Sequence, residues 1–211
     1  MTSPEESLVE ASRLLEEKGL NAGTSGNLSV RTAGGLLVTP SAVPPGQLSA
    51  DAMVHLGMDG SVTSGGVPTS EWRIHRDIYA GVVEAGAIVH THSTYATALA
   101  SLREDLPAFH YQVAKAGGHV VRCSEYAPYG TQELSAAVIA ALGDRRACLM
   151  ANHGMIAFGH DLGSALALAV ELEVLCQQYL IARSAGTPVM LTGQQMDVAL
   201  DSFSRYGQPE A

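Results

Sequence analysis

The sequence predicts a single α/β or α+β domain that spans residues 1–211. Three observations support this fold class. Segments with helical and strand-like patterns alternate along most of the chain, and we find no internal repeat, linker or low-complexity stretch. With 46% hydrophobic and 16% charged residues, the composition is that of a compact globular protein. A chain of 211 residues is also long enough to bury one sizeable core.

The N-terminal part predicts a helix followed by short strands. Ser3 can act as N-cap, with Pro4 at the first helical position and Glu6 completing a capping box, and Gly19 ends the helix. The glycine pair at 34–35 joins two apolar-rich segments into a hairpin. The following segments are expected to be a proline-containing loop in "SAVPPGQLS" and a strand with a turn in "AMVHLGMDGSV".

From residue 69 onward, helices and strands are expected to alternate. Thr69 and Ser70 predict the start of a helix in "TSEWRIHRDIYAGV", and Thr131 can cap the helix "TQELSAAVIAAL". The other expected elements are the strand "AIVHTH", the helix "STYATALASL", the strand "HVVRC", the strand "ACLMANHG" ending at His153, a long helix from Asp161, and a final helix over 193–204 with a short tail.

Charge and cysteine content narrow the class of protein. The net charge of −9 with only 12 basic residues argues against nucleic acid or an anionic membrane as the main partner. Cys123, Cys148 and Cys176 form no CxxC pair and are expected to be free thiols. The acidic N-terminus lacks a signal-peptide pattern, and the most apolar stretch carries Glu171 and Glu173. The sequence therefore predicts a soluble, cytoplasmic protein.

Three of the eight histidines occur where strands are expected to end. His90 and His92 are two residues apart in a strand, so their side chains point to the same face. His153 lies at the end of another expected strand. Three imidazoles with one open position are the ligand set of a catalytic zinc site. Ordinary structural roles are expected for His55, His75, His119 and His160.

Two further segments carry polar groups that suit a ligand. Glu71 at the start of its helix either complements the helix dipole or acts as a general base or fourth metal ligand. Thr69 and Ser70 either cap that helix or bind a phosphate at its N-terminus. The loop "GTSGN" at 23–27 exposes backbone N–H groups, but it matches no established phosphate-loop pattern, so a simple turn remains open.

Taken in order, several motifs resemble those of the class II aldolase/adducin family. They are "GLNAGTSGNLSVR", "LLVTPSAVP", "PTSEWRIHRDIY", "AIVHTH", "FHYQVAKAGG", "YAPYGTQEL" and "NHGMIAFG", and the resemblance covers about residues 8–207. It is strongest to members that cleave L-fuculose 1-phosphate. The resemblance implies a three-layer α/β/α domain with a central, mainly antiparallel sheet. It also implies a four-fold symmetric homotetramer with active sites between subunits.

The same resemblance implies roles for individual residues. His90, His92 and His153 match zinc ligands, and Glu71 matches the residue that coordinates the empty site and serves as acid/base during turnover. Tyr111 matches a tyrosine that reaches the neighbouring subunit's site and protonates the aldehyde oxygen. The residues that match the phosphate site are Thr24, Gly26, Asn27, Ser41, Thr69 and Ser70, and those that match the aldehyde pocket are Tyr129 and Tyr206.

The implied activity is reversible cleavage of a ketose 1-phosphate to dihydroxyacetone phosphate and an aldehyde such as L-lactaldehyde. Zinc, or alternatively Co²⁺ or Mn²⁺, would act as the Lewis acid, so no catalytic lysine is needed. Ala42 stands where the family usually has glycine, and Tyr129 where close relatives often have phenylalanine. These departures leave 5-deoxyribulose and 5-methylthioribulose 1-phosphates open as substrates.

Other functions fit the residues less well. Sugar-phosphate 4-epimerases of the family generally have aspartate where Glu71 stands, although epimerase or decarboxylase chemistry on this scaffold stays an alternative. Adducin-like scaffolding modules would have lost the metal ligands. Barrel-type metal hydrolases with a His-x-His strand need roughly 250 residues and more βα units than this chain provides.

Overall fold

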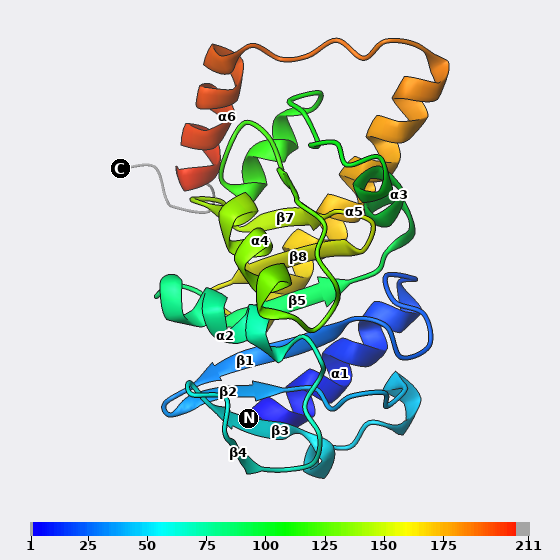
Figure 1. Cartoon of the computed structure of the whole chain (residues 1–211). Coiled ribbons are helices and arrows are strands. Elements are labelled where there is room, and N and C mark those ends of the chain that lie inside the picture. Colours follow the sequence, from blue (N-terminus) through cyan, green and yellow to red (C-terminus); the bar gives the residue numbers. More distant parts are fainter. Residues whose placement is uncertain (1, 206–211) are drawn as a thin grey trace.

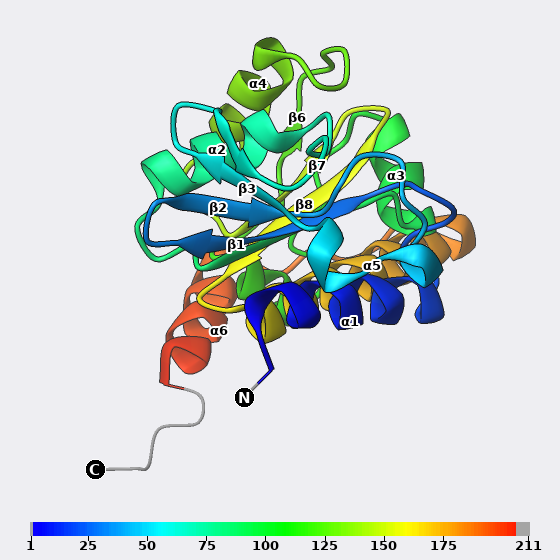
Figure 2. The ribbon, with the colours of Figure 1, turned by 90° about the horizontal axis from the view of Figure 1, so that it is seen from below.

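The structure is a computed structural model that describes residues 2–205, and it contains one eight-stranded sheet between two layers of helices (Figures 1 and 2). The strand order is β4-β3-β2-β1-β5-β8-β7-β6. Every neighbouring pair is antiparallel except β6 and β7. The strands are β1 (Asn27–Thr32), β2 (Gly35–Val38), β3 (Val54–Gly57), β4 (Val62–Ser64), β5 (Ala87–Thr91), β6 (Cys123–Ser124), β7 (Ala147–Met150) and β8 (Gly154–Gly159). The expected three-layer fold with a mainly antiparallel sheet is confirmed.

The helices divide between the two faces of the sheet. In Figure 2, α2 and α4 lie on one side, whereas α1, α5 and α6 lie on the other. The helices are α1 (Pro4–Glu17), α2 (Trp72–Gly81), α3 (Thr94–Ser101), α4 (Gln132–Leu142), α5 (Leu162–Ala185) and α6 (Gly193–Arg205). Short 3-10 turns are η1 (Pro45–Gln47), η2 (Ala50–Ala52) and η3 (Tyr111–Ala116).

Strand alternation builds a separate hydrophobic core on each face. Val89 of β5 and Ala157 of β8 point into the core under α1, α3 and α5. Their neighbours Ile88 and Ile156 point into the core under α2 and α4. Side chains two residues apart share a face, so His90 lies on the α2 side of the sheet with Ile88. The candidate ligands therefore extend from the end of a strand in the middle of the sheet.

The first helix forms as the sequence predicts. The side chain of Ser3 accepts from the backbone N–H of Glu6, and the Glu6 carboxylate accepts from the backbone N–H of Ser3. Helix α1 ends at Glu17, and Gly19 follows with a left-handed φ of +69°. The expected hairpin is also present, because β1 pairs antiparallel with β2 across the turn at 33–34.

The start of the second helix differs from the prediction. Helix α2 begins at Trp72 rather than near Thr69 and Ser70, and Glu71 is its N-cap residue. The backbone N–H of Thr69 donates to the carbonyl of Thr39, which keeps this segment extended beside the end of β2. A long-range backbone contact, which the capping pattern could not reveal, therefore moves the helix start beyond the predicted position.

Two strand predictions were also wrong in part. The expected strand at 119–123 is reduced to β6, Cys123–Ser124, with an isolated bridge between Val121 and Leu106. Backbone groups of this segment bond to side chains instead of to a neighbouring strand. Arg145 donates to the carbonyl of Val120, and the carboxylate of Asp105 accepts from the N–H of Cys123. In addition, β7 ends at Met150, and the following segment forms β8, which the sequence did not predict.

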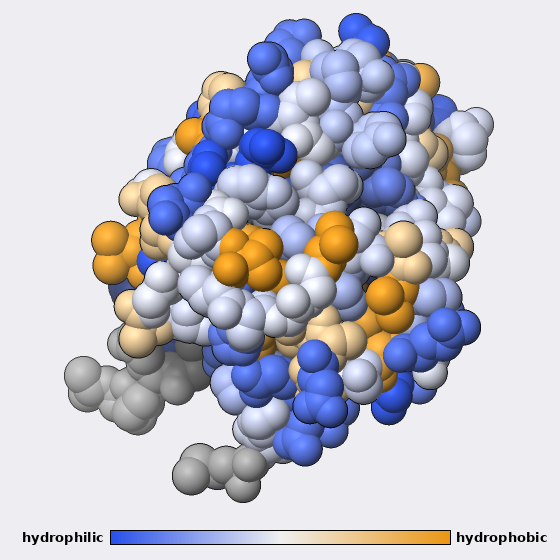
Figure 3. Space-filling model, turned by 60° about the horizontal axis from the view of Figure 1, so that its bottom comes forward, coloured by the Kyte–Doolittle hydropathy of each residue, from blue (hydrophilic) through white to orange (hydrophobic). Residues whose placement is uncertain are grey.

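Helix α5 is the one helix among residues 2–205 that is long and apolar enough to cross a membrane by composition. Many of its apolar residues, however, belong to the core over β5 and β8, whereas Val174 and Ile181 are exposed. On the side of the molecule drawn in Figure 3, the apolar surface patches are small and separated by hydrophilic residues. The three cysteine thiols are free, as expected.

Candidate metal centre and active site

The four candidate ligands come from three places in the fold: the end of β5, the turn between β7 and β8, and the residue before α2. His90 lies in β5, and His92 follows directly after that strand. His153 lies in the turn between β7 and β8, rather than at the strand end that the sequence predicted. Glu71 precedes α2. Because β5 pairs with β8, with His90 opposite Ile156, the connection that carries His153 lies beside the end of β5.

The turn that carries His153 is fixed by its own sequence. Asn152 has a left-handed φ of +53°, a conformation that asparagine tolerates better than most residues. The side-chain oxygen of Asn152 accepts from Arg103, and its backbone N–H donates to the carbonyl of Ala100. The backbone N–H of His153 donates to the carbonyl of Met150 and closes the turn. These contacts hold the imidazole over the end of β5.

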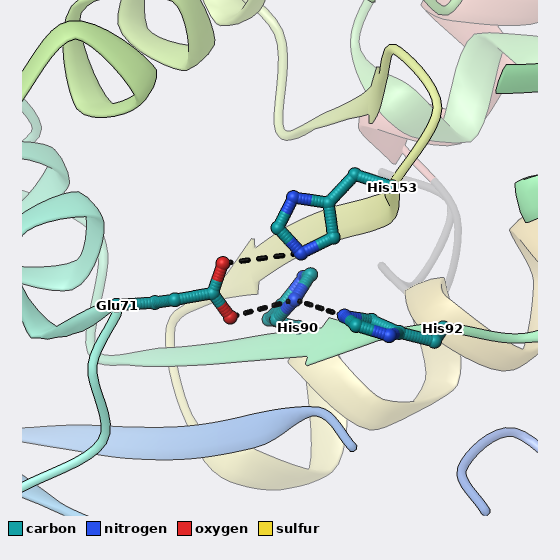
Figure 4. Close-up of side chains that lie close together, drawn as sticks. All are labelled: Glu71, His90, His92 and His153. Carbon is teal, nitrogen blue, oxygen red and sulfur yellow. Dashed lines mark hydrogen bonds and ion pairs between the residues drawn. The ribbon is translucent and has the colours of Figure 1, made fainter. Parts of the chain in front are cut away.

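The four side chains converge on one point (Figure 4). Nε2 of His90 lies 3.0 Å from Nε2 of His92 and 3.0 Å from Oε2 of Glu71. Nε2 of His153 lies 3.1 Å from Oε1 of Glu71. One ligating atom from each residue can be chosen so that all four lie within 4.8 Å of one another. This spacing is close to that of ligands sharing one ion with bonds of about 2.0–2.2 Å.

Nε2 of His90 faces the point where the four side chains converge. When the ring is neutral, its one proton is on Nδ1, so Nε2 carries none. Its Nδ1–H donates to the backbone carbonyl of Met155 at 2.8 Å. A hydrogen bond of this kind fixes the tautomer of a metal-binding histidine. A bare Nε2 and a carboxylate oxygen at 3.0 Å repel each other unless a cation lies between them.

Glu71 itself shows the same need for a cation. It is 5% exposed, and its Oε2 accepts a hydrogen bond from Nδ2 of Asn27 at 3.0 Å. Its Oε1 is buried and accepts no hydrogen bond from any of residues 2–205. A buried carboxylate oxygen without a donor is costly. The set of three imidazoles and one carboxylate therefore fits a divalent metal.

The charges of the site shift the pKa values of its members. Burial by itself would raise the pKa of Glu71, but His90 and His153 lower it far below its usual range. Burial acts to lower the pKa of His90, yet the carboxylate of Glu71 outweighs it and the pKa is raised. Burial and the neighbouring imidazoles lower the pKa of His92 to about 4. A carboxylate that stays charged beside a neutral His92 suits metal binding.

A cavity opens directly beside the four candidate ligands. All six residues that match the phosphate site line it, together with Glu71, His92, His153 and Tyr129. Its volume of about 160 Å³ exceeds what a single water needs. The structure thus brings the expected phosphate residues and the candidate metal ligands to the same cavity. The phosphate set comprises Thr24, Gly26, Asn27, Ser41, Thr69 and Ser70.

The loop at 23–26 can take its shape only with glycine at one position. Gly26 has a φ of +75°, and a Cβ there would lie 2.4 Å from the amide of Asn21. The side-chain oxygen of Asn21 in turn accepts from the backbone N–H of His92 at 3.2 Å. Asn21 therefore links the loop to a candidate ligand, a role that the sequence analysis missed.

Other predicted site residues are placed differently. Tyr129 lines the cavity and is 75% exposed. Tyr111 begins η3, is half-exposed and stacks on Phe203 of α6, with ring centroids 6.0 Å apart. It is not among the residues that line the cavity of the same chain. Tyr206 lies outside the described residues.

Asn27 and His75 make contacts near the site that the sequence did not predict. The side-chain amide of Asn27 contacts Glu71 through its NH₂ group and Nε2 of His75 through its carbonyl oxygen. His75 was expected to be an ordinary histidine, but it is fully buried directly behind Asn27. The sequence signal for this contact is the alternation of polar residues in "NLSVR".

The chain matches a family model and several characterised proteins. The model for the class II aldolase and adducin N-terminal domain matches residues 6–180. A 5-methylthioribulose-1-phosphate/5-deoxyribulose-1-phosphate aldolase from Rhodospirillum rubrum is 45% identical over 200 residues, covering 95% of this chain and 90% of the relative. An L-fuculose phosphate aldolase from Escherichia coli is 42% identical over 190 residues, covering 90% and 88%.

The fold agrees with these matches. A solved structure of an L-fuculose 1-phosphate aldolase superposes with a TM-score of 0.93 at 38% identity and covers 97% of this chain and 98% of the other. The family match, the relatives and the convergence of three imidazoles with one carboxylate lead to the same result. The chain belongs to the class II aldolase and adducin family, as one of its aldolases.

Proposed function

We propose that the protein is a zinc-dependent aldolase that reversibly cleaves a short ketose 1-phosphate to dihydroxyacetone phosphate and an aldehyde. The observation that carries this proposal is the position of Glu71. Its carboxylate contacts two imidazoles at 3.0 and 3.1 Å and borders a cavity lined by hydroxyl groups and a glycine-containing loop. Residues that could form a metal centre, an acid/base and an anion site thus adjoin one another, which supports cleavage beside a phosphorylated carbon.

In this proposal His90, His92 and His153 hold the metal, and Glu71 is a fourth ligand when no substrate is bound. The bound cation supplies a Lewis acid for the negative charge that develops on the dihydroxyacetone phosphate portion. Because imidazoles are neutral ligands, the cation would keep its full charge once the substrate displaces Glu71. Zn²⁺ suits three imidazoles, and Co²⁺ or Mn²⁺ are chemically acceptable replacements.

The loop at 23–26 and the hydroxyls of Ser41, Thr69 and Ser70 are proposed to hold the phosphate. They line the same cavity as the metal ligands, so they fix the distance between the phosphate and the reacting bond. Backbone N–H groups and hydroxyls bind a phosphate without a lysine. Both lysines of the chain, Lys18 and Lys115, are absent from the lining of this cavity.

Glu71 is proposed to move the proton at C3. In the cleavage direction the C3–C4 bond breaks and its electron pair remains with C3. Glu71, which has first taken up a proton from solvent, gives that proton to C3 and becomes a carboxylate again. In the synthetic direction the carboxylate takes the same proton. In the resting site His90 and His153 outweigh the effect of burial and keep the carboxylate charged, as a base must be in the synthetic direction.

Tyr111 is proposed to act at the other end of the breaking bond, in the site of a neighbouring subunit. In the synthetic direction its phenol donates a proton to the aldehyde oxygen as the C3–C4 bond forms, and cleavage reverses this transfer. Its half-exposed position outside the cavity of its own chain supports a cross-subunit role. The proposal therefore includes a homotetramer, located in the cytoplasm.

The aldehyde is the open part of the substrate. Cleavage between C3 and C4 would yield L-lactaldehyde from L-fuculose 1-phosphate, acetaldehyde from 5-deoxyribulose 1-phosphate, and a methylthio-substituted acetaldehyde from 5-methylthioribulose 1-phosphate. The names of the relatives support both substrate classes. Tyr129, at the exposed edge of the cavity, is proposed to contact the aldehyde, and Tyr206 is proposed to do so from the C-terminal tail.

The experiment that tests the proposal is release of dihydroxyacetone phosphate from these three substrates, with and without a chelator. Release that stops with chelator and returns with Zn²⁺ would support the metal-dependent aldolase, and the ranking of kcat/KM would name the aldehyde. A metal-loaded protein that releases none from any substrate would contradict the aldolase. Epimerisation or decarboxylation of a sugar phosphate would then be measured next.

A further inference from the structure

Behind Glu71, strand β1 and helix α2 are joined by a row of polar side chains. Asn27, Ser29 and Arg31 share one face of β1, and Glu71, His75 and Tyr79 follow one another at four-residue spacing at and within α2. Two residues along a strand advance about 6.7 Å. Four residues along a helix advance about 6.0 Å. The two rows are therefore nearly commensurate and can bond side chain to side chain.

The bonds of this row form one continuous chain. Nδ2 of Asn27 donates to Oε2 of Glu71 at 3.0 Å, and Oδ1 of Asn27 lies 2.5 Å from Nε2 of His75. Nδ1 of His75 lies 2.7 Å from Oγ of Ser29. That hydroxyl lies 2.8 Å from the phenol oxygen of Tyr79.

Only one direction of hydrogen bonding is consistent with a charged Glu71. A carboxylate accepts, so Asn27 must present its NH₂ group to Glu71 and its carbonyl oxygen to His75. His75 must then donate from Nε2, which leaves Nδ1 as an acceptor for the hydroxyl of Ser29. The phenol of Tyr79 completes the chain by donating to Ser29. Each link thus depends on the one before it.

The chain is sealed from solvent. His75 and Ser29 are 0% exposed, Tyr79 is 2% exposed and Asn27 is 6% exposed. Burial lowers the pKa of His75 to about 3, and burial raises that of Tyr79. Both side chains are neutral at physiological pH, and water does not compete for their hydrogen bonds.

We propose that His75 and Ser29 are positioning residues, which hold the amide of Asn27 with its NH₂ group toward the catalytic carboxylate. The role rests on the proposed function, because it presumes that Glu71 moves a proton. If Ser29 did not donate to Nδ1, the ring could adopt the other tautomer, and a bare Nε2 would then favour a flipped Asn27. The carbonyl oxygen of the flipped amide would face the carboxylate and repel it.

A purely structural reading makes a different prediction. If His75 only filled space, an apolar residue of similar size would replace it without affecting the active site. If it acts through Asn27, the replacement must keep an N–H donor at the position of Nε2. Glutamine can place its amide nitrogen there, whereas leucine cannot.

The first test is the tautomer of His75 in the metal-free wild-type protein, read from ¹⁵N chemical shifts of histidine-labelled samples. The signal is assigned by its loss in His75→Gln. The proposal requires a neutral ring with its proton on Nε2. A proton on Nδ1, or a charged ring at neutral pH, would overturn it. This measurement is independent of turnover, so it still decides the matter if no substrate is cleaved.

The second test compares His75→Leu with His75→Gln, using the full-length protein. Loss of an outer hydrogen-bond partner of a metal site typically costs about 10- to 100-fold in activity. We expect a loss of that size in kcat for His75→Leu, an unchanged KM, and recovery of most of the activity in His75→Gln. Equal losses in both variants, or a loss that appears in KM, would contradict a positioning role.

Ser29→Ala is the milder variant, and Ser135→Ala is its matched control. Ser135 is also 0% exposed and also bonds a residue of α2, but its partner is Asp77, outside the chain to Glu71. We expect similar losses of thermal stability in the two variants and a lower kcat only in Ser29→Ala. Equal kcat values would overturn the proposal. If the wild type cleaves no ketose 1-phosphate, the proposed function fails, and the tautomer alone decides whether the chain is polarised.

Discussion

Oε2 of Glu71 lies 3.0 Å from Nε2 of His90, while the opposite ring nitrogen of His90 donates to a backbone carbonyl. The two facing atoms are both acceptors whenever the ring is neutral. The site therefore requires either a proton or a metal ion between them. This relationship makes the metal content of variants the most direct readout of the site.

Loss of one imidazole should empty the site. We expect His153→Ala to bind metal far below one equivalent per chain after dialysis, because three imidazoles converge within the same cluster. His160→Ala is the control, since His160 is an exposed residue at the end of the β8 segment. Metal content measured by mass spectrometry checks both variants. Full occupancy in His153→Ala would exclude His153 as a ligand.

Glu71→Gln should separate metal binding from turnover. The three imidazoles remain, so we expect metal to be retained, whereas loss of a positioned acid/base costs about 10²–10⁴-fold in kcat. Glu84→Gln, at an exposed position, should behave as the wild type. Metal content and kcat are measured on the same preparations. Cleavage by Glu71→Gln at the wild-type rate would refute its role in proton transfer.

Ala42→Gly should stabilise the protein. Ala42 has a left-handed φ of +58°, which costs an L-residue with a Cβ about 1–2 kcal/mol. Part of that gain is offset because glycine orders more backbone on folding, so we expect a net increase of about 1 kcal/mol in the free energy of unfolding. Ala80→Gly, within α2, should lower it by about 0.5–1 kcal/mol. Denaturant unfolding of both variants shows whether the signs are opposite.

Glu173 should support both the fold and His92. Its two carboxylate oxygens accept from the backbone N–H groups of Tyr95 and Ala96 at 2.8 Å, at the start of the helix that follows His92. The N-cap residue of that helix provides no side-chain cap, so Glu173 replaces it from α5. We expect Glu173→Ala to lower the free energy of unfolding by about 1–2 kcal/mol and to weaken metal binding.

The control for this variant is Glu171→Ala on the same helix. Glu171 forms a partly exposed ion pair with Lys115, and such pairs contribute roughly 0–1 kcal/mol. Unfolding curves and metal titrations compare the two variants. Equal metal affinities would show that the cap does not position His92.

The metal-free protein should lose stability as the pH falls below neutrality. The folded pKa of His75 is about 3, below its usual value of 6.5, so between these values the unfolded chain binds a proton that the native state does not. The free energy of unfolding therefore decreases as pH falls through this window, by about 1.4 kcal/mol per pH unit for one such group. His92 acts in the same direction. Unfolding of wild type and His75→Gln at pH 6 and pH 5 checks this, and the variant should show the smaller slope.

Local sequence patterns predicted the parts of the site that depend on local geometry. The shared face of His90 and His92 follows from strand alternation alone, and the capping box of α1 follows from Ser3 and Glu6. The direction of the Asn27 amide could not be read from the chain. It depends on the contacts of Asn27 with Glu71 and His75, which lie 44 and 48 positions away in sequence.

The wrong element boundaries have similar causes. The start of α2 was misplaced because the backbone N–H of Thr69 donates to Thr39, which directly follows the distant strand β2. Strand β8 was missed because its residues are buried on both faces, so it has no polar alternation to mark it. Both errors arise where tertiary contacts override a local signal. They moved the expected position of His153 but left the choice of residue unchanged.

The register of β1 on β5 also determines where the chain can change length during evolution. Asn27 and Ser29 must remain an even number of residues apart on one strand, opposite a helix whose own residues recur every four positions. One residue inserted between them would turn every later side chain of the strand to the other face and separate the active site from its support. The turn at 33–34 lies beyond these contacts and can lengthen without this effect. Natural relatives with the same chemistry should therefore differ in length at that turn and not within the first three residues of β1.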